Sequence, residues 1–310
     1  MTALRTKYDA IVIGAGLGGL AAATMLAHEG LGVLLLERHN VPGGYATSFV
    51  RGRAAGEQPY EFEVALHELS GIGPPERRGN IYRSLEYLGM TDRVEFLHVD
   101  NLYRAVYDPA SPSGPDLDIT LPVGREAFEA KLAETFPHEA QGIRRFMDRV
   151  FKFGRDYARF LRQRRKVRPA TVPFRFPHFV RYLPTTWGQV LDRDVKDPAA
   201  RAVLSQYWGY VGLPPSQISF VYMASTLAAY VRRGAAFPKG RSQALSNAFL
   251  SRCEELGGEA RMNCGVARIT TRDGRVSGVI TEGGEEIAAD WIVSNACLLY
   301  TSPSPRDQRP

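Results

Sequence analysis

Hydrophobic residues near the start of the chain gather in two short runs with a helix-like segment between them. Residues 10–13 (Ala-Ile-Val-Ile) and 33–36 (Val-Leu-Leu-Leu) are wholly apolar, which is typical of buried strands. Residues 20–27 (Leu-Ala-Ala-Ala-Thr-Met-Leu-Ala) are mostly strong helix formers. The order strand, helix, strand predicts a βαβ unit, in which the two strands lie parallel in one sheet.

The remaining periodicity predicts further helices and strands. Apolar residues recur at helical spacing at 81–88, 125–136, 140–164, 197–211, 219–231 and 242–256, and a turn at 185–188 enters another helix. Alternating patterns predict strands at 58–67, 103–107, 117–121, 266–271, 276–281, 286–288 and 291–296. Asp273-Gly274 is a strong hairpin signal within a β meander. We predict an α/β fold: a Rossmann-like domain with a mostly helical domain inserted into it.

The turn between the first strand and the first helix has a glycine pattern that indicates chemistry. Gly14, Gly16 and Gly19 form G-x-G-x-x-G in the strand–turn–helix context that gives this motif its meaning. These glycines allow a tight turn, close approach to a pyrophosphate, and close helix–strand packing. Glu37 ends the second strand, where a carboxylate can accept hydrogen bonds from ribose hydroxyls. A membrane span at 10–27 fits poorly, because this minimal apolar run contains four glycines.

A second glycine pair, Gly43-Gly44, follows Pro42 shortly after Glu37. By itself, Pro-Gly is a turn signal that needs no function. A nicotinamide-binding unit does not need this second segment. A buried, permanently held dinucleotide does, because another stretch of backbone must then approach the pyrophosphate from the far side.

Together these segments resemble the FAD-binding region of flavoproteins related to carotenoid desaturases, carotene isomerases and retinol saturase. The resemblance rests on residues 9–20, on Glu37-Arg38 and on 43–49 (Gly-Gly-Tyr-Ala-Thr-Ser-Phe). It implies FAD as cofactor and an apolar polyene as substrate. At Arg241 the chain departs from the family pattern, which often has a second glycine there. The cofactor-binding residues implied by the motif and the resemblance are Gly14, Ala15, Gly16, Leu17, Gly18, Gly19, Glu37, Arg38, Gly43, Gly44, Tyr45 and, through its backbone near the adenine, Val266.

Composition and charge narrow the function classes. The 310 residues include 39 basic and 33 acidic side chains, and this net charge of +6 is too small to indicate nucleic-acid binding. The three cysteines form no CxxC or CxxxxC motif, which argues against a flavin disulfide reductase. The six histidines form no HxxH or HExxH pair, so no metal site is expected. No signal-peptide pattern precedes the first strand, and we expect a cytoplasmic protein.

The segment 151–181 interleaves basic and aromatic residues. One interpretation is a patch that contacts anionic lipid peripherally, where an apolar substrate would be dissolved. The alternative, which basic runs more often represent, is a solvated helix face followed by a loop. Nucleic acid ranks third, because no RNA- or DNA-binding motif accompanies the charge.

The domain organisation follows from these assignments. We expect an FAD-binding domain in two pieces, 1–78 and 236–296, with a substrate domain at 79–235 between them. Residues 297–310 match the in-frame translation of a transposase adapter used in short-read sequencing libraries. We expect this tail to be non-native and the chain to be an N-terminal fragment. The alternative is a natural tail rich in proline and serine.

The predicted activity is desaturation, saturation or isomerisation of an apolar polyene by hydride transfer to or from flavin. The sequence identifies no catalytic acid or base. His67 falls where the family has a histidine near the flavin ring, but a loop histidine bonded to backbone is the preferred interpretation. Two alternatives stay open: an FAD-dependent amine oxidase, and a lipid-binding escort protein on the same fold. Intact glycine segments argue against the escort protein. Six aromatic residues are expected mainly in the core, with some facing substrate: Tyr207, Trp208, Tyr210, Phe220, Tyr222 and Tyr230.

Overall fold

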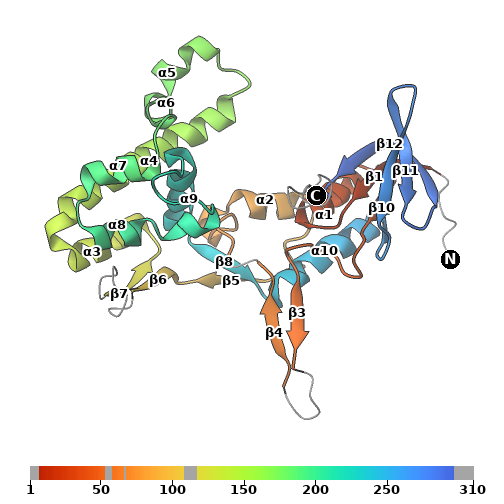
Figure 1. The fold of residues 1–310 in the computed structure, drawn as a ribbon, viewed down its shortest axis with the longest axis horizontal. Coiled ribbons are helices and arrows are strands. Elements are labelled where there is room, and N and C mark those ends of the chain that lie inside the picture. Colours follow the sequence, from red (N-terminus) through yellow and green to blue (C-terminus); the bar gives the residue numbers. More distant parts are fainter. Residues whose placement is uncertain (1–6, 53–57, 66–67, 108–116, 297–310) are drawn as a thin grey trace, which may run out of the picture. The chain divides into compact units, whose positions relative to one another are not determined.

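The computed structural model describes residues 7–52, 58–65, 68–107 and 117–296. They form two compact units, drawn as ribbons in Figure 1. The first takes its described residues from 1–68, 80–97 and 237–310, and the second from 69–79 and 98–236. The first unit thus includes the helix at 81–88, which the sequence placed in the inserted segment. The domain boundaries stay predictions, and His67 and the tail 297–310 lie outside the described residues.

A six-stranded sheet in the order β10-β11-β12-β1-β2-β9 forms the centre of the first unit. β12, β1, β2 and β9 are parallel neighbours, whereas β10, β11 and the start of β12 form an antiparallel meander. The strands are β1 (Lys7–Ile13), β2 (Val33–Leu36), β9 (Glu259–Arg261), β10 (Val266–Arg272), β11 (Arg275–Thr281) and β12 (Glu286–Ser294). The predicted α/β, Rossmann-like fold is confirmed.

The predicted βαβ unit is present at the centre of this sheet. β1 and β2 pair in parallel from Ala10↔Val33 to Ile13↔Leu36, and their apolar runs are buried. Helix α1 (Leu17–His28) connects them and begins three residues earlier than the periodicity predicts. It packs beside α10 (Arg241–Glu255), where the Thr24 hydroxyl donates to the Phe249 carbonyl oxygen at 3.1 Å.

β12 differs from the prediction, which divided it into strands at 286–288 and 291–296. It is one continuous strand with two kinds of neighbour. Its first residues pair antiparallel with β11, and from Ala288 onward it pairs in parallel with β1. Asp290, the polar residue at the supposed break, points to solvent and forms an ion pair with Lys7 instead of ending the strand.

The strand predicted at 58–67 is present in the first unit but is shorter, and it belongs to a separate two-stranded sheet. β4 (Tyr60–Glu63) pairs with β3 (Ser48–Arg51) as a two-stranded hairpin, visible in Figure 1. Phe49 and Phe62 stack across this hairpin at 5.3 Å and are exposed. The first unit also contains α2 (Asn80–Tyr87). A further two-stranded pair, β5 (Phe96–Val99) with β8 (Ala235–Pro238), includes the residues at which the chain passes between the units.

The second unit is mostly helical, as predicted. It also contains the antiparallel pair β6 (Asn101–Tyr107) and β7 (Leu117–Pro122). The helix predicted at 197–211 is α8 followed by a 3₁₀ turn at Gln206–Tyr210. The helices are α3 (Arg125–Thr135), α4 (Ala140–Gln163), α5 (Val172–Arg175), α6 (Pro177–Tyr182), α7 (Trp187–Asp194), α8 (Pro198–Leu204) and α9 (Phe220–Arg233).

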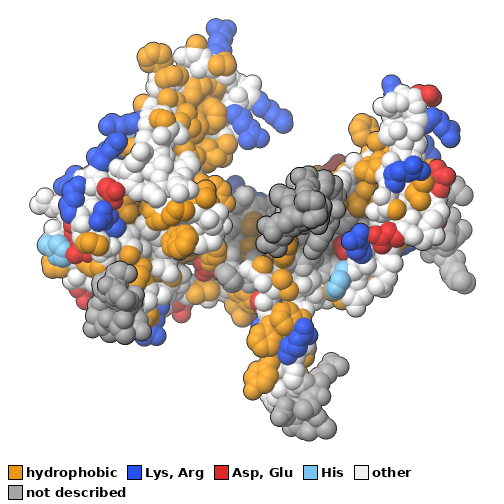
Figure 2. Space-filling view, in the orientation of Figure 1, with side chains coloured by type: hydrophobic (Ala, Val, Ile, Leu, Met, Phe, Trp, Pro, Cys, Tyr) orange, Lys and Arg blue, Asp and Glu red, His pale blue; other side chains and the backbone are white. Residues whose placement is uncertain are grey.

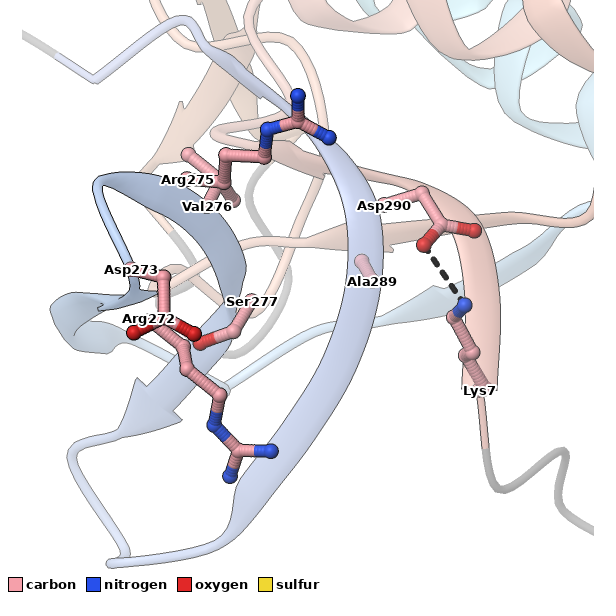
Figure 3. A pocket seen from close by; sticks show the side chains of 8 residues that line it. All are labelled: Lys7, Arg272, Asp273, Arg275, Val276, Ser277, Ala289 and Asp290. Carbon is pink, nitrogen blue, oxygen red and sulfur yellow. Dashed lines mark ion pairs between the residues drawn. The ribbon is translucent and has the colours of Figure 1, made fainter.

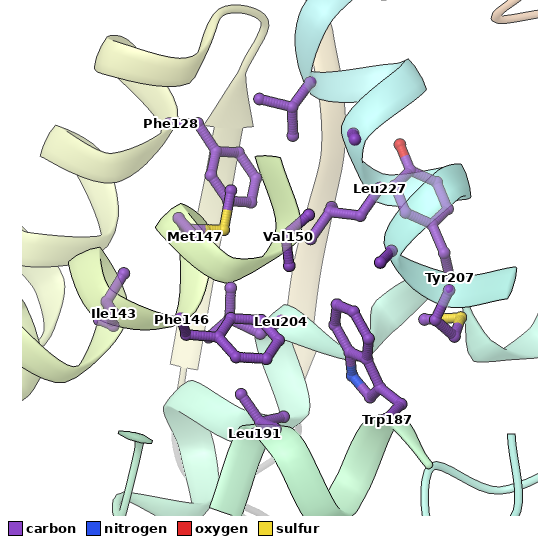
Figure 4. Packing of buried hydrophobic residues seen from close by; sticks show 14 of the residues in the cluster. Phe128, Ile143, Phe146, Met147, Val150, Trp187, Leu191, Leu204, Tyr207 and Leu227 are labelled. Atoms are coloured by element: carbon purple, nitrogen blue, oxygen red, sulfur yellow. The ribbon is translucent and has the colours of Figure 1, made fainter. Parts of the chain in front are cut away.

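An aromatic and aliphatic core holds these helices together (Figure 4). Phe146 of α4 meets the Trp187 ring edge-on at 4.8 Å, and the Trp187 Nε1–H donates to Ser205 Oγ at 3.0 Å. Of the six aromatic residues singled out in the sequence, Tyr207, Phe220 and Tyr230 are buried, whereas Trp208, Tyr210 and Tyr222 are exposed. Among the described residues, no helix combines the length and apolar character needed to cross a membrane.

Candidate cofactor site

The loop between β1 and α1 is shaped by its glycines. Gly14 has φ +90°, a backbone conformation that favours glycine, and its N–H donates to the Leu36 carbonyl at 2.7 Å. Gly19 faces this turn from the first turn of α1, and a Cβ there would overlap the Gly14 carbonyl oxygen. These two glycines therefore let the helix start directly against the ends of the sheet strands.

The first turn of α1 presents backbone donors. Its N-cap residue is Gly16, which offers no side chain to bond the N–H groups of residues 17–19. Leu20 is the first residue of α1 whose N–H bonds back into the turn, at 2.9 Å to the Gly16 carbonyl. Free N–H groups and the positive end of the helix dipole make such a turn a site for an anion. This satisfies the first requirement of a pyrophosphate site.

A second glycine segment lies directly against the first. The Gly43 N–H donates to the Ala15 carbonyl at 2.7 Å, and Gly43 and Gly16 form an isolated parallel bridge. Gly43 and Gly44 both have positive φ, at +123° and +59°. A Cβ on Gly44 would lie 3.1 Å from Gly16 Cα. The two glycine segments therefore lie side by side, and a side chain at position 44 would crowd the backbone of Gly16. That both segments hold a pyrophosphate stays a prediction.

Helix α10 holds this second segment in place. Ser246 is fully buried, and its hydroxyl donates to the Ala46 carbonyl at 2.8 Å. The Gln243 Nε2–H donates to the Pro42 carbonyl at 3.1 Å. Both ends of the Gly43-Gly44 turn are thus fixed by a helix that lies some 200 residues further along the chain.

Glu37 points from the end of β2 toward the first glycine loop. Its Oε2 accepts the Ala15 N–H at 2.5 Å, and its Oε1 accepts the His39 N–H at 2.8 Å. A carboxylate offers about four lone-pair positions, and the backbone occupies two of them here. The remainder can accept ribose hydroxyls, so the geometry fits the predicted role of Glu37.

Arg38, Tyr45 and Val266 lie at the edge of this arrangement. The Arg38 side chain is 67% exposed and pairs with Glu282 in the β11–β12 turn at 2.6 Å. Tyr45 is exposed. Val266 starts β10, and the residues just before it run beside Glu37, whose carbonyl accepts the Cys264 N–H at 2.7 Å. The start of β10 therefore lies next to Glu37.

Asn295, like Ser246 and Gln243, lies near this site and was not predicted from the sequence. It follows β12, and its N–H donates to the Ile13 carbonyl at 2.8 Å. Its side-chain amide lies over the start of α1: a Cβ on Gly18 would be 2.8 Å from Asn295 Oδ1, and one on Gly16 would be 3.0 Å from Nδ2. The available signal was position, because Asn295 is the first residue after a strand expected to lie in the same sheet as β1.

Other features of the described residues do not compete with this site. A shallow groove by the β10–β11 turn, lined in part by Arg272, Ser277 and Lys7, is drawn in Figure 3. Lys7 starts β1, whereas the glycine loop follows its end, so the groove is at the wrong end of the strand for a dinucleotide. Among the described residues no cluster of metal ligands exists. Burial raises the pKa of the Cys253 thiol to about 11 and also raises that of Cys264, so neither is a ready thiolate.

Residues 17–298 match the family model described as flavin containing amine oxidoreductase. The chain belongs to this family. Membership confirms the predicted cofactor, FAD, and the predicted class, FAD-dependent oxidoreductases. The residues that hold FAD in this chain stay a prediction.

Curated relatives confirm the resemblance to carotenoid and retinoid enzymes. Prolycopene isomerase 2 of an Oncidium hybrid cultivar is 28% identical over 98% of this chain and 52% of the relative. All-trans-zeta-carotene desaturase of Myxococcus xanthus is 30% identical over 95% of this chain and 53% of the relative. All-trans-retinol 13,14-reductase of Rattus norvegicus is 28% identical over 95% of this chain and 48% of the relative. The chain spans about half the length of these relatives.

Solved structures show the same fold. An oxidoreductase from Methanosarcina mazei matches with a TM-score of 0.61 at 19% identity, over 98% of this chain and 62% of the other. The RAB GDI of Plasmodium falciparum also matches with a TM-score of 0.61, at 14% identity, over 96% of this chain and 67% of the other. At these identities the likeness concerns the fold alone.

Proposed function

We propose that the protein acts on an apolar polyene of the carotenoid or retinoid type, as an FAD-dependent oxidoreductase that desaturates, saturates or isomerises it. The observation that carries the cofactor half of this proposal is the approach of Gly43 to Gly16 beside Glu37. The polyene half is supported by the names of the relatives, which include a carotene desaturase, a carotene isomerase and a retinol reductase.

The residues of this chain would bind and orient the cofactor. The N–H groups at the start of α1 and the turn at Gly43 would hold the pyrophosphate from two sides. Glu37 would accept the ribose hydroxyls, and Asn295 would brace the first turn of α1. FAD, when bound, supplies the hydride acceptor or donor. The full set proposed is Gly14, Ala15, Gly16, Leu17, Gly18, Gly19, Glu37, Arg38, Gly43, Gly44, Tyr45 and Val266.

The first test is the visible absorption spectrum of the purified 310-residue chain after incubation with FAD and removal of free cofactor. We expect flavin bands that correspond to near-stoichiometric binding of FAD in the unmodified protein. The same is expected of Glu86→Ala, a control that removes an exposed carboxylate of α2. We expect weaker loading in Glu37→Ala. Folded protein that takes up no flavin would refute the proposed cofactor site of this chain and favour the lipid-binding escort protein.

The second test separates substrate classes. The FAD-loaded protein is mixed without oxygen with a carotenoid in detergent, with retinol, or with a primary amine such as putrescine. We expect the carotenoid or retinol to bleach the flavin bands or to change its own spectrum, and we expect the amine to do neither. Bleaching by the amine alone would refute the polyene proposal and support an amine oxidase.

We further propose peripheral membrane contact through 151–181. An apolar polyene dissolves in lipid, so an enzyme that uses it gains access to substrate at a bilayer surface. The basic and aromatic character of this segment supports the proposal.

A further inference from the structure

One short segment of the second unit carries an unusual share of the chain's charge. Residues 157–183, here called the basic arm, contain eight Lys and Arg residues and no Asp or Glu. The rest of the chain contains 31 basic and 33 acidic residues, so its net charge is −2. The positive charge of the whole protein is therefore located in this arm.

The basic side chains of the arm are available for an external partner. Arg162, Arg164, Arg165, Lys166 and Arg168 are exposed, and within the described part of the chain none of them forms an ion pair. The nearest carboxylate in sequence, Asp156, is already used by Arg159 at 3.5 Å and by the His178 N–H at 3.0 Å. Figure 2 shows Lys and Arg side chains around this part of the molecule, with hydrophobic side chains beside them.

The arm is an ordered structure held by aromatic packing. Phe176 and Phe179 are buried, and Phe160 of α4 contacts Phe176 edge-on at 5.5 Å and Phe179 face-on at 4.8 Å. The Arg159 guanidinium donates to the Arg175 carbonyl and lies over the Phe176 ring. These contacts fix α5 and α6 against the end of α4.

The same packing turns one aromatic side chain outward. Phe174 lies in α5 between the buried anchors and the basic run, and it is 86% exposed, more than any other large hydrophobic residue of the described chain. Leu161 and Leu183 are also exposed on the arm. Exposed apolar side chains in the same segment as cations that form no ion pair with the described residues suit the boundary between lipid head groups and acyl chains.

We propose that the basic arm docks on an anionic phospholipid bilayer, with Phe174 inserted below the head groups and the run 162–168 on the lipid phosphates. Charge complementarity identifies the partner as anionic, and the exposed apolar residues favour lipid over nucleic acid. This deepens the proposed membrane contact by assigning it to particular residues. It rests on the charge and exposure of the arm and stands independently of the cofactor and of catalysis.

The test is co-sedimentation of the 310-residue chain with vesicles of phosphatidylcholine, with or without phosphatidylserine. We expect binding only to the vesicles with phosphatidylserine, and weaker binding as salt rises. Arg164→Gln/Arg165→Gln/Lys166→Gln should weaken it on the order of 100-fold, since each cation near such a surface contributes about a factor of five. Phe174→Ala should weaken binding about tenfold through lost apolar burial.

Two matched controls keep the result specific. Arg268→Gln/Arg272→Gln/Arg275→Gln removes three exposed cations from the β10–β11 hairpin, and Trp291→Ala removes an aromatic side chain that is 72% exposed in β12. Both should bind vesicles like the unmodified protein. Equal losses in controls and arm variants, or equal binding to neutral vesicles, would refute docking through the arm. Tighter binding to a short RNA or DNA duplex than to vesicles, lost in the arm variants, would assign the arm to nucleic acid instead.

Discussion

Glu37→Ala is the change that most directly tests the candidate cofactor site. The carboxylate accepts two backbone N–H groups, that of buried Ala15 at 2.5 Å and that of exposed His39 at 2.8 Å. Water replaces the acceptor for His39, so only the Ala15 N–H is left unpaired. A hydrogen bond to a charged group is worth about 1.5–3 kcal/mol. We therefore expect Glu37→Ala to lower the free energy of unfolding by about 1–3 kcal/mol, measured by urea denaturation without cofactor.

The same substitution should weaken cofactor binding separately. Loss of an acceptor for the ribose hydroxyls should cost about 1–3 kcal/mol, which is a roughly 5- to 150-fold rise in the Kd for FAD. The assay is quenching of flavin fluorescence during titration. Glu37→Gln keeps one carbonyl oxygen, so its losses should fall between those of the unmodified protein and Glu37→Ala. Unchanged FAD affinity in a destabilised Glu37→Ala protein would show that Glu37 only braces the glycine loop, and would refute its binding role.

Three other substitutions test neighbouring parts of the structure. Gly19→Ala should lower the free energy of unfolding by about 1–3 kcal/mol, because its Cβ would overlap the Gly14 carbonyl oxygen; urea denaturation measures this. Ser246→Ala should weaken FAD binding by about 0.5–1.5 kcal/mol, because the Gly43-Gly44 turn loses its buried hydrogen bond to α10. Asp197→Ala should lower the free energy of unfolding by about 1 kcal/mol at pH 7, again measured by urea denaturation, because the Asp197 carboxylate caps α8 by accepting the N–H groups of residues 199 and 200.

The first two substitutions have matched controls, and the third has an expected pH dependence. Gly18→Ala meets only the end of the Asn295 side chain, which can turn away, so a loss equal to that of Gly19→Ala would contradict the packing argument. Ser84→Ala removes an exposed hydroxyl bond and should leave FAD binding unchanged. Burial pushes the pKa of Asp197 up, but its hydrogen bonds with the α8 backbone and His138 outweigh this and lower it. Its contribution should thus be complete above the unfolded pKa near 3.8 and vanish as the pH falls through the lower folded value.

The elements that sequence reasoning located are those whose apolar pattern is continuous. β1, α1, β2 and the long helix α4 have buried faces built from regularly spaced apolar residues. The short strand β9 (Glu-Ala-Arg) was missed, because it is held at the sheet edge by backbone pairing with β2 and its sequence has no apolar pattern. β12 was divided in two, because Asp290 interrupts its apolar run while the backbone pairing with β1 continues.

The candidate site shows the same division between local and distant information. Gly14, Gly16, Gly19 and Glu37 belong to one βαβ unit, so their spacing alone grouped them. Gly43 and Gly44 follow that unit, and the family resemblance added them. Ser246 and Asn295 reach the site only through tertiary structure, because α10 and β12 come back to the glycine segments from 200 or more residues away. Arg241 has φ +70° at the start of α10. The backbone there keeps a conformation suited to glycine, which explains why a glycine often stands at that position in the family that the sequence resembles.

The pairing of β1 with β12 has a consequence for how the protein assembles during synthesis. Ala10 finds its partner Val33 in β2 almost at once, whereas Lys7 pairs with Ala288, about 280 residues later. Closing the longer loop costs roughly 2 kcal/mol more than closing the shorter one, unless the second unit folds first and shortens the gap. Until residue 294 leaves the ribosome, one edge of β1 stays open, with the apolar run 10–13 beside unpaired backbone groups. An open apolar edge invites pairing with other chains, so overexpression at high temperature should favour aggregates, and slow synthesis or a chaperone should favour the native sheet.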